Sequence, residues 1–285
     1  MRLSSGARVG STGWGSVPTL LVAFLAAVAL AARGVAPPPG APIPHEPSAL
    51  AARFEATTHD LVAAVDRWRG SGAQRVPEDV TLDALYLQRI LILLAERRRL
   101  AREVLRRLPP AEARPARNEI LARRELGRLS HPRPLSAFRT GPAEPAERLR
   151  GYYVEAQRRF GVGWNVLAAV NYVESAFNKL RNASTAGAQG PMQFLPATWR
   201  AYGRGGDIYD PHDAILGAAN YLHANGAPRN YYRALFRYNP SWLYVDAVLR
   251  YAGRIRADPD AYYIFYSRQV FVRTPRGLVR LTGPK

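Results

Sequence analysis

Apolar residues recur at helical spacing along most of the chain from position 49 onwards. Residues 86–108 carry the longest stripe, whose apolar positions fall on one face of a helix at about 100° per residue. The members of this stripe are Leu87, Ile90, Leu91, Leu94 and Leu105. Residues 54–68 and 116–129 show the same pattern, and prolines separate the three segments. The pattern predicts a helical hairpin or small bundle over residues 49–128, which is too short to bury a large core alone.

Another helical pattern, over residues 163–177, ends in an acidic residue. On a helix Leu167, Val170 and Glu174 share one face, so Glu174 is expected on the side that faces the core. A carboxyl held against apolar surface has its charged form disfavoured, and such a group can donate a proton near neutral pH. The alternative is a helix-end glutamate that caps a neighbouring group or pairs with Arg181.

A glycine-rich loop follows this helix. Gly187 and Gly190 precede Met192-Gln193-Phe194, and glycine permits a positive φ and a close approach of the backbone. The Gln193 side chain can both donate and accept hydrogen bonds. Such a loop is typical of the wall of a polysaccharide groove, which lowers the weight of the purely structural interpretation of Glu174.

The pattern changes to alternation near the C-terminus. Residues 269–273 and 278–281 alternate on either side of Thr274-Pro275-Arg276-Gly277, which predicts a terminal β-hairpin. We expect this hairpin to cover one edge of the groove. The predicted fold class is therefore mainly α, with a helical catalytic domain that carries a small C-terminal hairpin and follows the helical module of residues 49–128.

The N-terminus has the character of an export signal. Arg2 and Arg8 precede an apolar run over residues 17–32 that is rich in small residues, so we expect a segment that is either cleaved or kept as a membrane anchor. The chain has no cysteine, so a lipid anchor attached to a cysteine is excluded. The body of the protein is thus expected in the cell envelope, outside the cytoplasm.

Composition then divides the whole chain into five predicted parts. Proline-rich stretches mark the two linkers, and the preferred role of the helical module is packing or spacing that holds the catalytic domain off the membrane. The parts are a signal peptide or anchor (1–36), a linker (37–48), the helical module (49–128), a second linker (129–146) and the catalytic domain (147–285).

Several motifs in this last part occur in a recognisable order. Glu174-Ser175-Ala176-Phe177-Asn178 is followed by Gly187-Ala188-Gln189-Gly190-Pro191-Met192-Gln193-Phe194, then by Tyr238-Asn239 and Tyr244-Val245. This order resembles the soluble lytic transglycosylase family, which has a lysozyme-like fold. The resemblance covers roughly residues 147–255. Pro240-Ser241 departs from it, since many relatives carry a small-residue turn there.

The resemblance implies a reaction and a set of site residues. Family members cleave the β-1,4 bond between N-acetylmuramic acid and N-acetylglucosamine in peptidoglycan and leave a 1,6-anhydro sugar, without a metal or an organic cofactor. Glu174 matches the single catalytic glutamate, acting first as general acid and then as general base. The implied substrate-binding residues are Ser175, Asn178, Gly190, Met192, Gln193, Tyr238 and Asn239, of which Asn239 is expected to brace the loop that carries Tyr238.

The number of carboxylates separates this reaction from hydrolysis. Hydrolytic glycosidases use two carboxyl groups, about 5–5.5 Å apart in retaining enzymes and about 6.5–9.5 Å apart in inverting ones. Asp210 and Asp213 flank Pro211 in a pattern typical of a helix start, and Asp246 fits a solvated helix face. Asp207 is the least explained, so a muramidase of the same fold would use Asp207 as its second carboxylate. A non-catalytic wall-binding scaffold is the third alternative.

Charge and histidine placement bear on the partners. The formal net charge is +18, but the arginines are scattered and no nucleic-acid motif accompanies them, so nucleic acid is not an expected partner. Anionic polymers and lipid headgroups of the envelope are better matched to such a surface. His212 and His223 have no partner at metal-ligand spacing, so no metal site is predicted.

Overall fold

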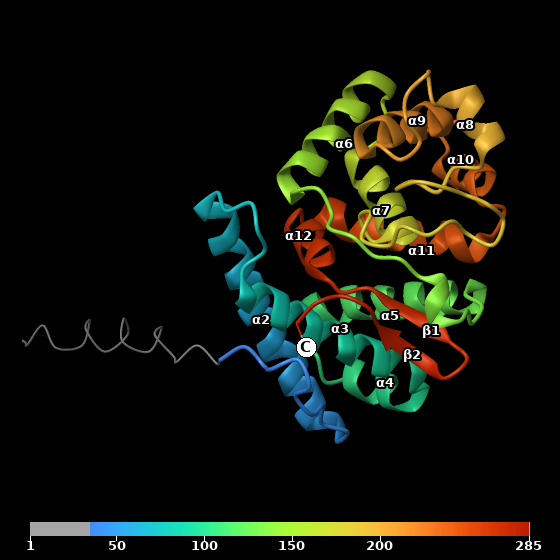
Figure 1. Cartoon of the computed structure of the whole chain (residues 1–285). Helices are drawn as coiled ribbons and strands as arrows, with labels where there is room; N and C mark the ends of the chain where they lie inside the picture. The colour runs from blue at the N-terminus through green and yellow to red at the C-terminus, as the bar shows by residue number, and fades with distance from the viewer. Residues whose placement is uncertain (1–34, 285) are drawn as a thin grey trace, which may run out of the picture. The chain divides into compact units, whose positions relative to one another are not determined.

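The computed structural model describes residues 35–284, and the predicted signal or anchor falls almost entirely outside them. From Ala36 the chain forms one packed unit, mostly helical (Figure 1). In chain order its elements are α2 (Pro47–Ser71), α3 (Glu78–Glu96), α4 (Arg98–Leu105), α5 (Pro110–Leu129), the 3-10 helix η1 (Leu135–Ala137), α6 (Ala146–Phe160), α7 (Trp164–Ser175), α8 (Pro196–Tyr202), α9 (Pro211–Ala224), α10 (Tyr231–Tyr238), α11 (Trp242–Ala257), α12 (Asp260–Ser267), β1 (Phe271–Thr274) and β2 (Gly277–Arg280). None of the described helices combines the length and the apolar character needed to cross a membrane.

The helices of residues 49–128 differ from the prediction at one point. The helix expected over residues 86–108 is two helices, because Arg97 adopts φ −100° and ψ 82° and ends α3 there. This break turns α4 so that Ala101 and Val104 are buried, and α4 contacts α2, α3 and α5. Arginine favours helices, so nothing in the local composition announces the break.

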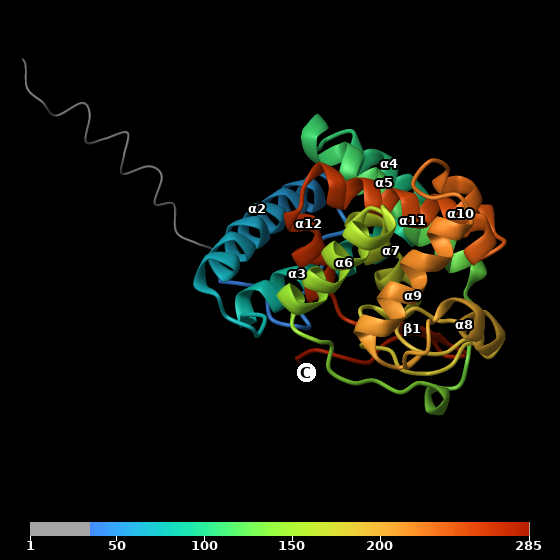
Figure 2. The ribbon, with the colours of Figure 1, turned by 90° about the horizontal axis from the view of Figure 1, so that it is seen from above.

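α7 lies in space among the other helices of the second half of the chain. It contacts α6, α9, α11 and α12, and Figure 2 shows it among them. Leu167, Ala168, Ala169 and Val170 are completely buried, in agreement with the apolar stripe that predicts this helix. The helix is shorter than predicted, since it ends at Ser175 and not at Phe177.

The expected helical module and the expected catalytic domain share one hydrophobic core. α5 packs along α11, and α2 and α3 pack against α12. The Arg250 guanidinium of α11 pairs with the Glu125 carboxylate of α5, with Nε 3.2 Å from Oε2. The structure thus packs the module against the helices around α7, and the division of the chain at residues 129–146 stays a prediction from composition.

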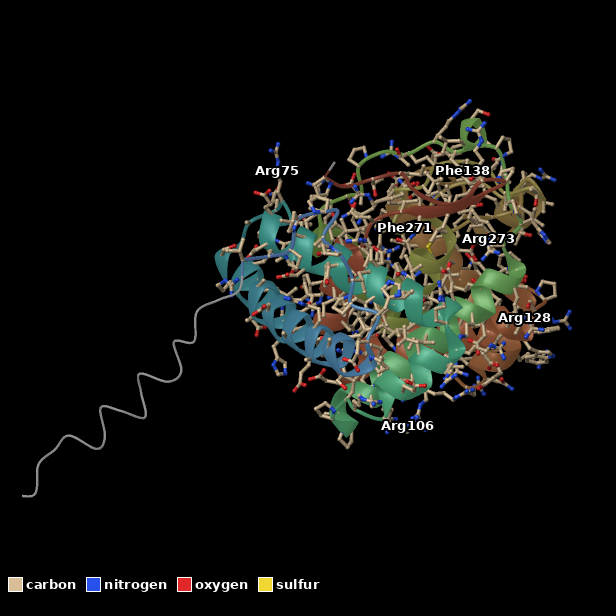
Figure 3. All side chains as sticks on the ribbon, turned by 90° about the horizontal axis from the view of Figure 1, so that it is seen from below. Arg75, Arg106, Arg128, Phe138, Phe271 and Arg273 are labelled. Carbon is tan, nitrogen blue, oxygen red and sulfur yellow. The ribbon has the colours of Figure 1, made fainter. Side chains whose placement is uncertain are left out.

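The predicted terminal hairpin is confirmed. β1 and β2 pair antiparallel, with Phe271 opposite Arg280 and Thr274 opposite Gly277. The amide of Arg133, in the stretch before α6, donates to the carbonyl of Arg273 at 3.1 Å. Figure 3 shows Phe271 and Arg273 on this hairpin. The same view labels three arginines elsewhere on the molecule, Arg75, Arg106 and Arg128. The expected cover of a groove edge by this hairpin remains a prediction.

Removing the helical module is expected to unfold the remainder. A chain that starts at residue 129 would expose the apolar faces of α11 and α12 that α5, α2 and α3 cover, and exposed apolar faces of this kind promote aggregation. Gel filtration and near-ultraviolet circular dichroism would test this, with a chain that starts at residue 36 as the control. A monomeric, cooperatively folded 129–285 fragment would show instead that the catalytic part is independent.

Candidate active site at the end of α7

Glu174 lies one residue before the end of α7, and the backbone after the helix adopts a left-handed conformation. Ala176, Phe177 and Asn178 have φ values of 50°, 63° and 65°, a left-handed conformation that is unfavourable for residues other than glycine. The Phe177 side chain between them is fully buried. The helix therefore ends abruptly beside Glu174, and packing of Phe177 compensates the strain that this ending costs.

Buried polar side chains join this helix end to the glycine-rich loop. The Ser175 hydroxyl donates to the Pro191 carbonyl at 2.7 Å and accepts from the Asn178 amide at 2.8 Å. The Asn171 side chain donates to the same Pro191 carbonyl at 2.8 Å and accepts from the Tyr153 hydroxyl at 2.6 Å. Buried groups satisfied in this way fix a single arrangement, so the loop is held at one distance from Glu174.

The loop itself is a tight turn that requires glycine. Gln189 and Phe194 exchange backbone hydrogen bonds of 2.8 and 2.9 Å across it. Gly190 has φ 75°, and a Cβ there would lie 1.9 Å from the carbonyl oxygen of Ile208, so no other residue fits without movement. The Gln193 side-chain amide donates to the Gly190 carbonyl at 2.9 Å, which closes the turn.

The Glu174 carboxyl is withdrawn from water and touched by one hydroxyl. Tyr244, a buried residue of α11, donates from its hydroxyl to Oε1 of Glu174 at 2.6 Å. Burial raises the pKa of Glu174 to about 7, while the hydrogen bond from Tyr244 acts in the opposite direction. The side chain as a whole stays partly exposed. Glu174 can thus hold a proton near neutral pH and still be approached from outside.

Tyr244 is the site residue that the sequence did not single out. Its motif carries part of the family resemblance, but no role follows from the motif alone. One signal was available, because a tyrosine on the buried face of a helix needs a partner for its hydroxyl. The structure supplies the Glu174 carboxyl as that partner.

Tyr238 is also close to this carboxyl, although its hydroxyl is used elsewhere. It is the last residue of α10, and its hydroxyl donates to the Met192 carbonyl at 2.6 Å. Burial, followed by the charge of Glu174, raises the pKa of Tyr238 well above its usual range. Asn239 follows as the residue that ends α10, with its amide on the Leu235 carbonyl. Tyr238 therefore ties the helix exit to the loop beside Glu174.

The other predicted substrate-binding residues fall into two groups. Ser175 and Met192 are buried, and in this conformation they hold the loop and the helix end together. Asn178 and Gln193 are partly exposed, as are Gly190, Tyr238 and Asn239, so a ligand at this surface can reach all five. The assignment of all of them to sugar contacts remains a prediction.

Of the other candidate carboxylates, Asp246 lies on α11, whereas Asp207, Asp210 and Asp213 form hydrogen bonds around the start of α9. Asp210 caps the helix by accepting from the Asp213 amide at 3.0 Å, as its sequence pattern predicts. Asp213 accepts from the Asp207 amide at 2.9 Å, and Asp207 accepts from the Tyr209 amide at 2.9 Å. Within residues 35–284, no second carboxylate contributes to the raised pKa of Glu174.

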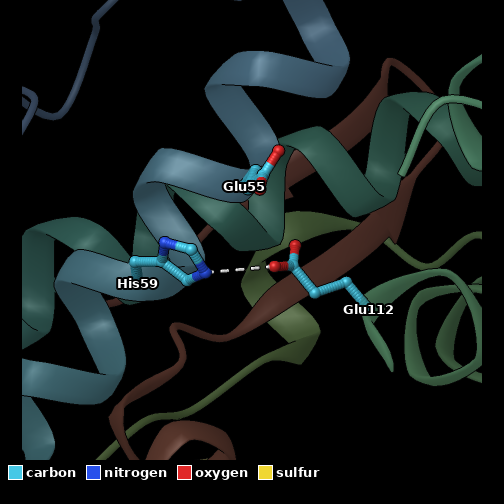
Figure 4. A group of neighbouring side chains, drawn as sticks. All are labelled: Glu55, His59 and Glu112. Atoms are coloured by element: carbon cyan, nitrogen blue, oxygen red, sulfur yellow. Dashed lines mark ion pairs between the residues drawn. The ribbon is translucent and has the colours of Figure 1, made fainter. Parts of the chain in front are cut away.

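Two clusters of possible metal ligands exist among the described residues, neither predicted from spacing. Asp210, His212 and Asp213 gather at the start of α9, and Glu55, His59 and Glu112 gather where α2 meets α5 (Figure 4). In the second cluster Nε2 of His59 lies 3.2 Å from Oε1 of Glu112. In the first cluster Asp210 caps α9, and Nε2 of His212 lies 2.9 Å from Oε2 of Glu155 on α6. An ion pair between helices accounts for the contact of His59 with Glu112 in the second.

Comparison with known proteins shows what part of this chain is similar to. Residues 151–255 match the family model described as "Transglycosylase SLT domain". The chain is 30% identical over 122 residues to a "Membrane-bound lytic murein transglycosylase F" of Thiobacillus denitrificans, covering 40% of this chain and 26% of that protein. It is 27% identical over 159 residues to a "Membrane-bound lytic murein transglycosylase F 1" of Alkalilimnicola ehrlichii, covering 50% and 32%. The chain thus spans about a third or less of these relatives, and no solved structure matches it significantly.

Gly190→Ala is expected to destabilise the fold more than Gly187→Ala does. Both glycines have a positive φ, 75° and 80°, but a Cβ at Gly187 would meet nothing within 4 Å. The conformational cost of about 1–2 kcal/mol is common to both variants, so the difference isolates the clash with Ile208. We expect that difference to exceed ~2 kcal/mol in denaturant unfolding. Equal losses in the two variants would show that the loop can move away from Ile208.

Glu174→Gln is expected to stabilise the protein at about pH 8 and to have little effect at about pH 5. The pKa of Glu174 is raised from 4.5 to about 7 in the folded state, so the folded protein holds this proton more tightly than the unfolded chain. The free energy of unfolding therefore falls as the pH rises through this range, by up to ~3 kcal/mol.

Denaturant unfolding at several pH values would measure this effect. Exposed Glu96 offers a matched control, Glu96→Gln, which should keep the pH dependence of the original protein. The raised pKa would be refuted by a pH dependence that survives unchanged in Glu174→Gln.

Proposed function

We propose that this protein is a peptidoglycan lytic transglycosylase with Glu174 as its single acid and base, since residues 151–255 match the family model of the transglycosylase SLT domain. The substrate would be the β-1,4 bond between N-acetylmuramic acid and N-acetylglucosamine. The names of the two relatives, both lytic murein transglycosylases, support this substrate class. The observation that carries the mechanism is a carboxyl whose burial raises its pKa to about 7 without a second carboxylate among the causes.

In the first step the protonated Glu174 donates its proton to the glycosidic oxygen. The bond between that oxygen and C1 of the muramic acid breaks, and positive charge develops on the sugar ring. The pKa near 7 makes Glu174 protonated in a large fraction of molecules at neutral pH, which is what a general acid requires. The leaving N-acetylglucosamine end departs as an alcohol.

In the second step the Glu174 carboxylate takes the proton of the C6 hydroxyl. The C6 oxygen bonds to C1 and closes the 1,6-anhydro ring, and Glu174 regains the proton that it lost in the first step. The Tyr244 hydroxyl, 2.6 Å from Oε1, stabilises the carboxylate between the two steps, because a hydrogen bond to the charged form favours that form. Water takes no part in this cycle.

Hydrolysis would need another group to activate water. Asp207, the candidate from the sequence, is exposed and uses its carboxylate on the Tyr209 amide. This local role explains Asp207 as part of the turn before α9, so the structure offers no specific support for the muramidase alternative.

The proposed place of action is the cell envelope. Export through the N-terminal segment, either cleaved or kept as an anchor, would bring the enzyme to peptidoglycan strands. The formal net charge of +18 would favour contact with anionic polymers or lipid headgroups there. No metal or organic cofactor enters the proposed reaction.

Mass spectrometry of products released from purified peptidoglycan tests the proposal. We expect the protein to release muropeptides lighter than the hydrolysed species by one water, and Glu174→Gln to lower their release by at least ~10³-fold. Glu96→Gln, a surface change of the same kind, should release products at the original rate.

Other outcomes would count against specific parts of this proposal. Reducing ends in place of anhydro ends would establish a muramidase and direct attention to Asp207. Undiminished release by Glu174→Gln would refute the role of Glu174. Binding of glycan strands without any release would favour a scaffold protein.

A further inference from the structure

The largest completely buried side chain of the described residues belongs to Arg268, which follows α12. Its guanidinium Nη2 donates to a carboxylate oxygen of Glu119 on α5. The side chains are 1% and 11% exposed, so the pair is almost dry. Nη1 of Arg268 donates to the Tyr172 hydroxyl of α7 at 3.3 Å. One guanidinium therefore joins α5 of the helical module to the helix that carries Glu174.

The buried ion pair of Arg268 and Glu119 is not expected to add much to the stability of the fold. Removing two charges from water costs free energy that their attraction only partly returns, so a buried pair often stabilises no more than apolar residues of similar volume. Its directional hydrogen bonds, however, do define one relative position of the elements they join. A positional role for Arg268 accounts for the pair better than stability does.

Tyr172 connects the Arg268 guanidinium to the region around Glu174. It precedes Glu174 by two residues on α7, and its ring stacks on Phe177 with centroids 5.5 Å apart. Phe177 is the buried middle residue of the left-handed stretch after the helix. The Tyr172 ring also stacks on Phe265, with centroids 5.2 Å apart and an angle of 12° between the ring planes. Any shift of Tyr172 would thus reach the turn that follows Glu174.

A second connection starts from the main chain of Arg268. Nζ of Lys179 donates to the Arg268 carbonyl at 2.9 Å and also to the Tyr266 carbonyl. Lys179 comes directly after Asn178, the last residue of the left-handed stretch. The side chain of Arg268 thus contacts α7 before Glu174, while its carbonyl holds the chain just after the strained turn.

We propose that Glu119 and Arg268 are positioning residues, through which the helical module fixes Tyr172, the turn 176–178 and hence the Glu174 carboxyl. The contribution to turnover rests on the function proposed above, whereas the contribution to the order of the turn does not. The module is then a working part of the active site and not a spacer.

Two conservative variants test this role in the whole chain. Glu119→Gln removes the charge but keeps the size and an acceptor for Arg268, and Tyr172→Phe keeps the stacked ring but removes the hydroxyl. Glu112→Gln is the matched control, because Glu112 also lies on α5, is 15% exposed, and pairs with His59 of α2.

Hydrogen exchange gives a readout that does not depend on catalysis. The amides of residues 176–180 are all hydrogen-bonded, to the Tyr172, Asn171, Ala176 and Ser175 carbonyls and to the Ser175 hydroxyl. We expect Glu119→Gln and Tyr172→Phe to speed their exchange at least ~10-fold, and Glu112→Gln to leave it unchanged.

Turnover of peptidoglycan provides the second readout. We expect both test variants to lower kcat by ~10–100-fold with little change in KM, since misplacement of a catalytic group affects the reacting geometry more than binding. The double variant should be no worse than the poorer single variant, because both changes interrupt one chain of contacts.

The outcomes distinguish this proposal from the proposed function. Original exchange rates at residues 176–180 in both test variants, or equal acceleration in Glu112→Gln, would overturn the positioning role. If the unchanged protein releases no product, the proposed function fails. The hydrogen-exchange rates of residues 176–180 in the variants then still test whether Glu119 and Arg268 order the turn. If Glu119→Gln does not fold, Tyr172→Phe decides alone.

Discussion

The structure depends on holding one carboxyl, that of Glu174, away from water without closing it off. The end of α7 meets this requirement, because the helix stops one residue later and the chain turns sharply away. Burial then raises the pKa of the carboxyl to about 7, and the Tyr244 hydroxyl stabilises its charged form. A proton that is held and released near neutral pH follows from this balance.

Such a helix end is strained, and neighbouring elements must hold it. Asn171 and Ser175 bind the Pro191 carbonyl from inside the helix, and Gly190 lets the loop reach Ile208 closely. Beyond these local bonds, α5 of the helical module contacts both α11, which carries Tyr244, and the Arg268 side chain that reaches α7. The surroundings of Glu174 thus include elements from both halves of the chain.

Those features that rest on local pattern could be predicted from the sequence. The apolar stripe before Glu174 predicts its helix and its burial, the glycines predict the tight loop, and alternation predicts the terminal hairpin. The break at Arg97 was missed because helical periodicity continues across it. Tyr244 and the pair of Glu119 with Arg268 were missed because their partners lie 70 and 149 positions away, where only the folded chain brings them together.

In the proposed reaction the leaving sugar is replaced by a hydroxyl of the substrate itself and not by water. Digestion of peptidoglycan in water enriched in oxygen-18 tests this most directly, because hydrolysis places one solvent oxygen on each new reducing end. The proposed cycle of Glu174 predicts released muropeptides free of the heavy isotope. Incorporation of one heavy oxygen atom per cleavage would contradict it and would require a second group that activates water.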